Sequence, residues 1–276
     1  MRLNEFRNIN EFLEYSSSTR NERILVESRI QQEKKKFKKW NLIGFCELCQ
    51  KDSRFEFDTK NINFRESLKC EHCKLINRWR FVLSYLKKIL KNTNSNTSVF
   101  MYEQVTPLFK YAENFFKNIN LIGSEFLGYD KKPGEIIRNI RHENSMELSF
   151  NDNSFDIIVS TDVFEHVPDI QKTLTEAYRV LKENGTLLIS VPLDVNKQET
   201  IQRAVFDNGK IKSLLPEVYH GNPMSSKGSL VFYDYGWDFL NFLRKAGFKE
   251  VYCLDYFSIF YGYLGNGFQF IIVAKK

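Results

Sequence analysis

From Ser98 onward, short apolar segments alternate with longer stretches that mix apolar and charged residues. The apolar segments predict buried strands, and the stretches between them predict helices. Such alternation is typical of a mainly parallel sheet that is covered by helices on both faces. It predicts an α/β fold with a sheet domain over residues 98–276. The expected strands cover residues 98–102, 120–125, 155–161, 185–191, 249–254 and 268–275.

Local signals mark several helices of this domain. Thr106 is a candidate N-cap before Pro107, and Asn184-Gly185 is a usual C-terminal stop. A further helix is expected after the strand at 185–191, before an insertion that is punctuated by glycine and proline. The other expected helices cover residues 107–116, 169–181 and 233–246.

Residues 1–97 lack this alternation and are expected to form a small separate unit. Apolar residues recur at helical spacing from Phe6 to Leu13, from Ile24 to Ile30, and over residues 77–91. The polar run Asn92–Ser98 has neither period nor bulk, and it predicts a linker or a helix exit. A domain boundary is therefore expected near residue 97.

Four of the five cysteines, Cys46, Cys49, Cys70 and Cys73, fall in one short segment. Two Cys-x-x-Cys knuckles offer four thiolates, which suit a closed tetrahedral zinc site. Residues 45–75 are too few to fill a core, so the metal would supply much of the folding free energy, about 10 kcal/mol or more in peptides of this kind. Because four thiolates leave no coordination position open, the zinc is expected to be structural.

The alternative for these cysteines is two disulfides in an exported protein. The first segment, MRLNEFRNINEFLEY, has no hydrophobic block of the kind found in an export signal, so a cytoplasmic protein with reduced thiols is expected. His72 lies inside the second knuckle and is expected to be a bystander, because four cysteines already satisfy zinc. Cys253 lies in an apolar strand and is expected to be an inert core residue.

Composition excludes other classes of protein. A chain of 276 residues, 42% of them apolar, can bury a full core, which excludes disorder. No run of about 18 apolar residues occurs, so a soluble protein without a membrane span is expected. The net charge of +6 is a mild excess, part of which lies in one basic patch. The patch contains Lys34, Lys35, Lys36, Lys38 and Lys39.

The stretch LSFNDNSFDIIVSTDVFEHVPDIQKTLTEAYRVLKENGTLLISVPL begins at Leu148. It resembles the small-molecule branch of the class I S-adenosylmethionine-dependent methyltransferases, whose members have a segment like LPFPDNSFDLVVSSDVLEHVPD, then a helix ending in RVLKPGG and a strand ending in VP. Weaker correspondences extend over residues 98–276. The resemblance implies a Rossmann-like sheet of seven strands, with S-adenosylmethionine across the carboxyl ends of the first strands.

The resemblance also implies a cofactor loop after the first strand, where this sequence lacks the family's glycine-rich motif. Glu103 can occupy the acidic position at the strand end, and the helix that begins at Pro107 can receive a carboxylate at its N-terminus. Gln104 and Thr106 are expected to replace glycine backbone contacts with side-chain hydrogen bonds, although the bulk of Val105 would press the loop outward. A chain that had lost cofactor binding would be a non-catalytic interaction protein.

By the same resemblance, Glu125 matches the acidic residue that holds the ribose hydroxyls. The segment RHENSME corresponds to the part of the family that meets the adenine amino group. Asn144 falls on the acidic position there, Ser145 offers the next backbone amide, and Glu143 is an alternative to Asn144. The alternative for Glu125 is a solvated acidic residue in a turn.

Polar residues follow the strand at 155–161, at the edge where ligands of open α/β sheets bind. Ser160 and Asp162 are expected to border the cofactor. Glu165 and His166 lie at the same rim, and their alternative is a helix-entry cap with surface charge. His166 and His220 are the candidate general bases, since a hydroxyl or amine acceptor must lose a proton. A lone histidine is more often a surface or satisfied residue.

The insertion EVYHGNPMSSKGSLVFYDYGWDF is expected to be a lid, in which Tyr219, His220 and Asn222 lie beside aromatic residues. The acceptor is expected to be a small molecule, because related methyltransferases with a four-cysteine knuckle often accompany glycan or polysaccharide assembly, which suggests a sugar hydroxyl. The alternative is an RNA methyltransferase whose N-terminal lysines contact phosphates. A lysine run is more often a solvated helix face.

Overall fold

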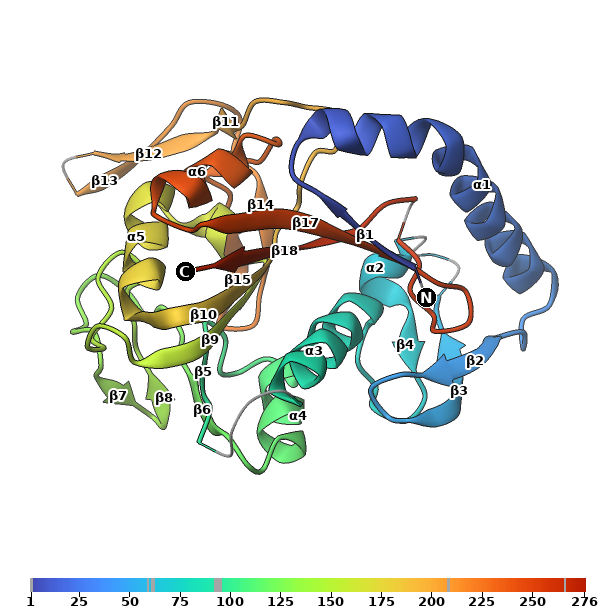
Figure 1. Cartoon of the computed structure of the whole chain (residues 1–276), viewed down its shortest axis with the longest axis horizontal. Helices are drawn as coiled ribbons and strands as arrows, with labels where there is room; N and C mark the ends of the chain where they lie inside the picture. Colours follow the sequence, from blue (N-terminus) through green and yellow to red (C-terminus); the bar gives the residue numbers. More distant parts are fainter. Residues whose placement is uncertain (1, 59, 61–62, 92–95, 208, 266) are drawn as a thin grey trace. The chain divides into compact units, whose positions relative to one another are not determined.

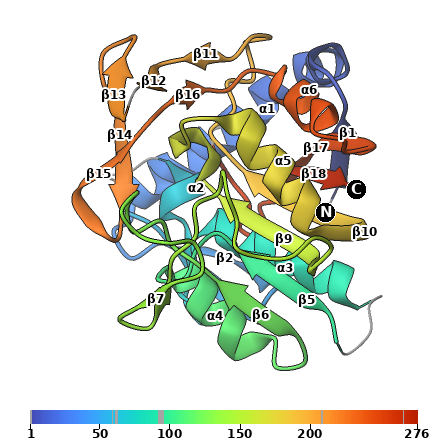
Figure 2. The same cartoon turned by 90° about the vertical axis from the view of Figure 1, so that its left-hand side faces the viewer.

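A seven-stranded sheet forms the framework of the computed structural model, which describes residues 2–58, 60, 63–91, 96–207, 209–265 and 267–276. The strand order is β1-β17-β18-β10-β9-β5-β6. Parallel pairing joins β10 to β9, β9 to β5 and β5 to β6, whereas β18 is antiparallel to β10. Figure 2 shows β9, β5 and β6 side by side. The seven strands are β1 (Arg2–Phe6), β5 (Ser98–Met101), β6 (Asn120–Gly123), β9 (Phe155–Thr161), β10 (Leu181–Ser190), β17 (Glu250–Phe257) and β18 (Phe270–Lys275).

All six strands expected from the sequence lie in this sheet, and the predicted Rossmann-like α/β fold is confirmed. In β9 every residue except Asp156 is buried, as in a parallel sheet that is covered on both faces. The resemblance implies seven strands, but the apolar segments locate only six of them. The seventh, β1, contains Phe6, which the helical spacing places in a helix. β1 instead pairs antiparallel with β17, from Arg2 opposite Phe257 to Phe6 opposite Cys253. It thereby satisfies the backbone of a strand that would otherwise be an edge.

The helices beside the parallel strands begin close to where the sequence signals place them. In α4 (Pro107–Phe115) the hydroxyl of Thr106 accepts the amide of Phe109, and in α5 (Ile170–Val180) the side chain of Asp169 accepts the amide of Lys172. The stop at Asn184 lies later than the observed end, since β10 already begins at Leu181. A short 3-10 helix, η1 (Phe164–His166), joins β9 to the loop before α5.

Between β10 and α6 (Phe239–Lys245) the structure departs from the sequence prediction. The helix expected after the strand at 185–191 is absent from the described residues 191–207 and 209–238. These residues form short antiparallel pairs instead. The expected helix 233–246 begins only at Phe239. The reason is that the hydroxyls of Tyr233 and Tyr235 bond the carbonyls of Pro168 and Phe164, which holds this segment extended. The pairs are β11 (Ile201–Gln202) with β16 (Tyr233–Asp234), β12 (Ala204–Asp207) with β13 (Lys210–Ser213), and β14 (Tyr219–Asn222) with β15 (Ser225–Leu230); a fourth pair earlier in the chain is β7 (Ile136–Ile137) with β8 (Ile140–Arg141).

The chain divides into two compact units. One contains Met1–Phe6, Asn10–Asn94 and Cys253–Ile271, and the other contains Arg7–Ile9, Ser95–Tyr252 and Ile272–Lys276. The expected boundary near residue 97 lies close to this division, and the expected linker at 92–98 lies partly outside the described residues. Residues 253–271 differ from the expectation, because they cluster with the N-terminal residues rather than with the rest of the sheet domain.

The first unit is built around one long helix and a small sheet (Figure 1). The two helical patterns expected before the cysteines belong to a single helix, α1 (Ile9–Lys36). Its buried Arg23 binds Asp255, and its Glu27 accepts the amide of Gly265, so residues from the C-terminal part of the sequence complete this core. The other elements of the unit are β2 (Leu42–Cys46), β3 (Lys51–Glu56), α2 (Phe64–Ser67), β4 (Lys69–Cys70) and α3 (Asn77–Leu90). Among the described residues no helix has the length and apolar character needed to cross a bilayer.

Candidate active site and metal centre

Glu103 occupies the carboxyl end of β5, where the family resemblance expects an acidic residue. Its side chain is buried, and its Oε1 accepts hydrogen bonds from the backbone amide of Thr161, at 3.0 Å, and from the hydroxyl of the same residue. Thr161 is the last residue of β9. Glu103 therefore joins the ends of two neighbouring parallel strands within the rim.

The next two candidate residues also bind other parts of the chain. The side-chain amide of Gln104 donates to the carbonyl of Asn139 at 2.9 Å and accepts the amide of Arg141 at 2.8 Å. The hydroxyl of Thr106 accepts the amide of Phe109 and so caps α4. Both side chains thus shape the loop that follows β5, in a place where many cofactor-binding loops rely on glycine.

Glu125 supports that loop from the neighbouring strand end. Its Oε1 accepts the backbone amides of Gln104, at 2.8 Å, and Val105, at 2.9 Å. Burial raises the pKa of Glu125, and these two amides oppose that rise. The carboxylate is half-buried and hydrogen-bonded, which disfavours the alternative of a solvated acidic turn residue.

A glycine outside the expected motif allows a close backbone approach at this rim. Gly123 is the last residue of β6, and a Cβ there would lie 2.9 Å from the carbonyl oxygen of Glu103 and 2.4 Å from the ring of Phe109. Such a contact would force the loop and α4 apart. The sequence prediction did not include this residue, because the family's glycine-rich motif follows the first strand, whereas Gly123 lies at the end of the second.

The segment expected at adenine is a tight turn. Oδ1 of Asn144 accepts the amide of Met146 at 3.1 Å, and the hydroxyl of Ser145 lies 3.2 Å from that of Thr173. Glu143, the alternative to Asn144, is buried, and its carboxylate accepts from Arg141 and from the backbone and hydroxyl of Ser149. Its acceptor atoms are already engaged, which favours Asn144 as the more available group of the two.

Ser160 and Asp162 lie at the end of β9. The side chain of Ser160 is fully buried, and its hydroxyl has no hydrogen-bond partner among the described residues. Asp162 has a φ of 53°, in the left-handed region, and its carboxylate accepts the hydroxyl of Ser190 at 2.9 Å. A left-handed aspartate at the end of a strand is a strained arrangement of the kind that gathers at functional sites.

The two candidate catalytic histidines lie together, with Glu165 between them. The ring centroids of His166 and His220 are 5.1 Å apart. Oε1 of Glu165 lies 3.8 Å from Nε2 of His166 and 3.5 Å from Nδ1 of His220. The pKa of His220 is raised, chiefly by the neighbouring carboxylate of Glu165. We call Glu165, His166 and His220 the rim cluster.

The sequence predicts Glu165 at the rim, with a helix-entry cap that carries surface charge as the alternative. The structure excludes surface charge, because only 1% of Glu165 is exposed and both carboxylate oxygens lack a hydrogen-bond partner among the described residues. Its backbone is held by Phe232, whose amide donates to the carbonyl of Glu165 at 2.7 Å. The available sequence signal was its position beside His166 at the carboxyl end of a buried strand.

His220 reaches the rim from the β14–β15 hairpin, within the segment predicted as a lid. Opposite it lies Ser229, and the register shifts between His220 and Asn222. Gly228 has a φ of 85°, and a Cβ there would lie 2.3 Å from the carbonyl oxygen of His220. The hairpin can therefore bring His220 to Glu165 only with glycine at this position.

The four clustered cysteines lie in the first unit. Their sulfur atoms are all within 4.8 Å of one another, as a tetrahedral thiolate site requires after a small contraction. In both knuckles the residue after the second cysteine has a positive φ, 55° at Gln50 and 58° at Lys74. Its amide donates to the carbonyl of the first cysteine, at 2.8 Å in one knuckle and 3.0 Å in the other. The two knuckles thus share one backbone geometry.

The neighbours of these cysteines agree with the sequence analysis. The ring of His72 contacts the carbonyl of Asp52 at 3.0 Å, and the grouping of metal-ligating atoms contains the cysteines without it. Cys253 is fully buried in β17. Among the described residues no disulfide joins any of the five cysteines.

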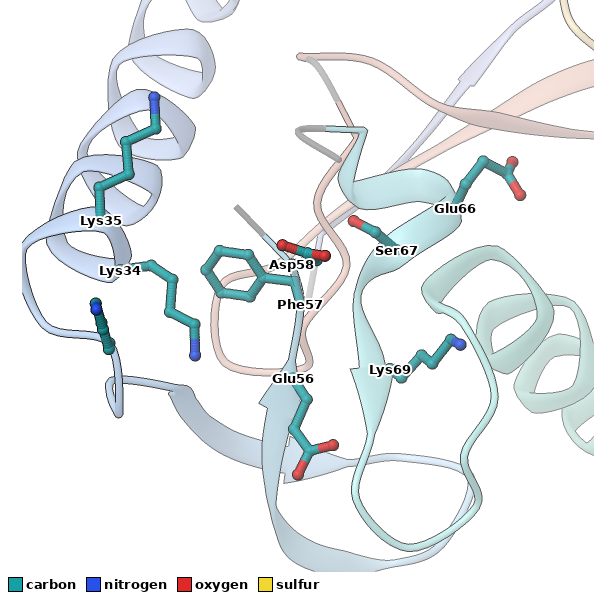
Figure 3. Close-up of a pocket in the computed structure, with 9 residues that line it drawn as sticks. Lys34, Lys35, Glu56, Phe57, Asp58, Glu66, Ser67 and Lys69 are labelled. Carbon is teal, nitrogen blue, oxygen red and sulfur yellow. The ribbon is translucent and has the colours of Figure 1, made fainter. Parts of the chain in front are cut away.

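The lysine run lies at the end of α1 beside a cavity of about 790 Å³ (Figure 3). The side chains of Lys34 and Lys35 come from the helix, and Phe57 lies across from them. Three carboxylates line the same cavity as the lysines and offset most of their charge. The lining residues are Lys34, Lys35, Lys38, Glu56, Phe57, Asp58, Glu66, Ser67 and Lys69.

Comparison with known proteins bears on the second unit. Residues 109–189 match a family model described as a methyltransferase domain. The match contains Glu125, Asn144, Ser145 and the residues at the end of β9, whereas Glu103 and His220 lie outside it.

Curated relatives share part of the chain. A demethylmenaquinone methyltransferase from Listeria welshimeri is 32% identical over an alignment of 129 residues. The alignment covers 41% of this chain and 51% of the relative. A ubiquinone/menaquinone biosynthesis C-methyltransferase from Rickettsia prowazekii is 33% identical over 160 residues, 52% of this chain and 63% of the relative. The chain thus spans about half the length of the first of these relatives.

Solved structures give more distant matches. An S-adenosylmethionine-dependent methyltransferase from Mesorhizobium loti has a TM-score of 0.44 at 14% identity, over 70% of this chain and 96% of that one. A phosphoethanolamine N-methyltransferase from Haemonchus contortus, in complex with S-adenosyl-L-methionine, has a TM-score of 0.43 at 15% identity, over 72% of this chain and 52% of that one.

Proposed function

We propose that this protein is an S-adenosylmethionine-dependent methyltransferase that acts on a small-molecule acceptor. The observation that carries the proposal is the match of residues 109–189 to a family model described as a methyltransferase domain, a segment that contains most of the polar rim described above. The acidic residues at the ends of β5 and β6 support the proposal, because a bound nucleoside needs acceptors for its hydroxyl groups.

The residues at this rim fit the cofactor by their chemistry. Oε1 of Glu125 is engaged with two loop amides, which leaves Oε2 to accept from the ribose hydroxyls. The buried hydroxyl of Ser160 has no partner in the described chain, and a bound ligand would supply one. The other proposed cofactor contacts come from Glu103, Gln104, Thr106, Asn144, Ser145 and Asp162. When bound, S-adenosylmethionine supplies the methyl group from its sulfonium.

The rim cluster is proposed to take the proton that the methyl acceptor loses. His166 and His220 are the proposed catalytic residues, and the side chain of His220 is 37% exposed, so an acceptor can reach it from solvent. The names of the curated relatives refer to quinone precursors. A quinone-type ring and a sugar hydroxyl are therefore the two acceptor types to assay first, with formation of S-adenosylhomocysteine as the readout.

We also propose that Cys46, Cys49, Cys70 and Cys73 hold a structural zinc ion. Support comes from the mutual distances of the four sulfurs and from the shared geometry of the two knuckles. The ion would join the end of β2 to β4, on either side of β3, within the first unit.

Isothermal titration with S-adenosylmethionine and S-adenosylhomocysteine tests the proposed function. Micromolar binding of both is expected. Glu125→Gln keeps an amide oxygen for the loop amides but loses one carboxylate acceptor, so it should weaken binding by about 1–3 kcal/mol, the range for hydrogen bonds to a charged group.

The matched control is Glu113→Gln, an exposed glutamate of α4, which should bind like the wild type. Absence of binding to the wild-type protein would favour the non-catalytic interaction protein. Equal affinities of wild type and Glu125→Gln would remove Glu125 from the site.

A further inference from the structure

The geometry points to a second metal site, and we propose that Glu165, His166 and His220 bind a divalent transition-metal ion of the zinc class. Metal binding by these residues is independent of methyl transfer. The use of the ion to activate the acceptor rests on the proposed function and would replace the role of the two histidines as general bases, because a nitrogen lone pair that binds a metal cannot also take a proton.

The first observation is the orientation of His166. Its Nδ1 lies 2.8 Å from the carbonyl oxygen of Leu230. A carbonyl only accepts, so Nδ1 carries the hydrogen, and the neutral ring presents a lone pair at Nε2. Metal-bound histidines usually show this arrangement, with the other ring nitrogen donating to a carbonyl or carboxylate.

The second observation is that the buried carboxylate of Glu165 lies close to Nε2 of His166 without a hydrogen bond between them. The distance from Nε2 of His166 to Oε1 of Glu165 is 3.8 Å, which is too long for a hydrogen bond. Neither carboxylate oxygen of Glu165 has a hydrogen-bond partner among the described residues, although the side chain is 1% exposed. Buried carboxylates are ordinarily paired or bound to metal. A cation between these groups would be coordinated by Nε2 of His166 and by the carboxylate of Glu165.

The third observation is the distance between the ligand atoms. One atom from each of the three residues lies within 4.8 Å of the other two, and His220 Nδ1 is 3.5 Å from Glu165 Oε1. Bonds of 2.0–2.1 Å at tetrahedral angles place neighbouring ligand atoms about 3.3 Å apart. Small rotations of the side chains would therefore close the site around an ion.

The backbone holds two of the ligands in place before any metal binds. The hydroxyl of Tyr235 donates to the carbonyl of Phe164 at 2.7 Å, and the amide of Phe232 donates to the carbonyl of Glu165. These bonds fix η1, which supplies Glu165 and His166. The third ligand, His220, comes from the β14–β15 hairpin, so an ion would also join that hairpin to the rim.

The ligand set selects the metal and its use. Two imidazoles and one carboxylate suit zinc, iron, cobalt or nickel better than magnesium or calcium, which prefer oxygen. Three protein ligands leave at least one position open, as in catalytic rather than structural zinc sites. An acceptor hydroxyl bound at that position would lose its proton to water at a lower pH than a free hydroxyl.

Metal analysis of the full chain tests the proposal without any activity measurement. Protein stripped with a chelator and dialysed against zinc should contain two ions per chain. His220→Ala should contain one, and Lys227→Ala, an exposed substitution in the same hairpin, should contain two. Titration with Co²⁺ identifies the ion that is lost, because a four-thiolate site gives intense sulfur-to-cobalt absorption and the rim cluster does not.

The expected result is that His220→Ala keeps the full sulfur-to-cobalt absorption but binds one equivalent fewer. Glu165→Gln should show the same loss, and a melting curve establishes that each variant is folded. A wild-type content of one zinc, or a second ion that survives both substitutions, would overturn the proposal. Titration with S-adenosylhomocysteine is measured separately, so failure of the metal site and failure of the proposed function give different results.

Discussion

Glu125 has two functions in the proposed site, and they use different oxygen atoms. Oε1 supports the loop after β5 through the amides of Gln104 and Val105, while Oε2 is the proposed ribose acceptor. The residue type was predictable from the strand end and the family resemblance. Its support of the loop was not, because the interaction joins residues of two different strand ends that the sequence does not place together.

The raised pKa of Glu125 gives a pH dependence at the residue scale. Burial raises this pKa above the ordinary value of 4.5, and ribose hydroxyls donate more strongly to the ionised form, which offers two acceptor oxygens. Cofactor affinity should therefore fall as the pH is lowered through the raised pKa, at a higher pH than for an ordinary glutamate. Titrations with S-adenosylhomocysteine at a series of pH values measure the effect. Glu125→Gln should lack it, and an equal fall in both proteins would contradict the assignment.

At the scale of elements, the knuckles are the most predictable part of the chain. The spacing of the cysteines and the absence of a competing core indicated the zinc site, and the shared turn geometry agrees with it. Hairpins such as β14–β15 were harder to predict, because their strands are short and partly polar and are held by contacts with η1.

Removal of the proposed structural zinc should unfold the first unit locally. After chelation, hydrogen exchange should accelerate in residues 45–75 and remain slow in β9 and β10, because the knuckles have little core of their own. Cys70→Ala should reproduce the effect and lower the zinc content by one ion. Cys253→Ala, which removes a buried thiol outside the cluster, should leave the zinc content unchanged. Slow exchange in the stripped protein would show that packing alone stabilises the knuckles.

At the scale of the whole molecule, residues far apart in the sequence share one core. Arg23 of α1 binds both carboxylate oxygens of Asp255 in β17, at 2.9 and 2.7 Å, and both side chains are buried. The guanidinium also donates to the hydroxyl of Tyr15 and to the carbonyl of Gly267. This pair helps to explain why residues 253–271 cluster with the N-terminal residues.

Arg23→Met should destabilise the first unit by about 3–5 kcal/mol, because it leaves the carboxylate of Asp255 buried without its partner. Adding Asp255→Leu should recover part of the loss, since both charges are then absent. Urea unfolding measures both changes. The matched control is Glu250→Gln, which breaks an exposed ion pair with Lys275 and should cost about 1 kcal/mol or less. Equal effects of the buried and the exposed substitution would show that Arg23 does not stabilise the core.

The sequence by itself determined the α/β class, six of the seven sheet strands, the start of α4 and α5, and the metal-ligand spacing of the cysteines. These features depend on local periodicity, capping and spacing, which a single chain displays directly. Tertiary structure alone decided the pairing of β1 with β17, the burial of Glu165 and its approach to His220. Each of these depends on contacts between residues that are distant in sequence, and their free energy comes from burial and pairing that no local pattern records.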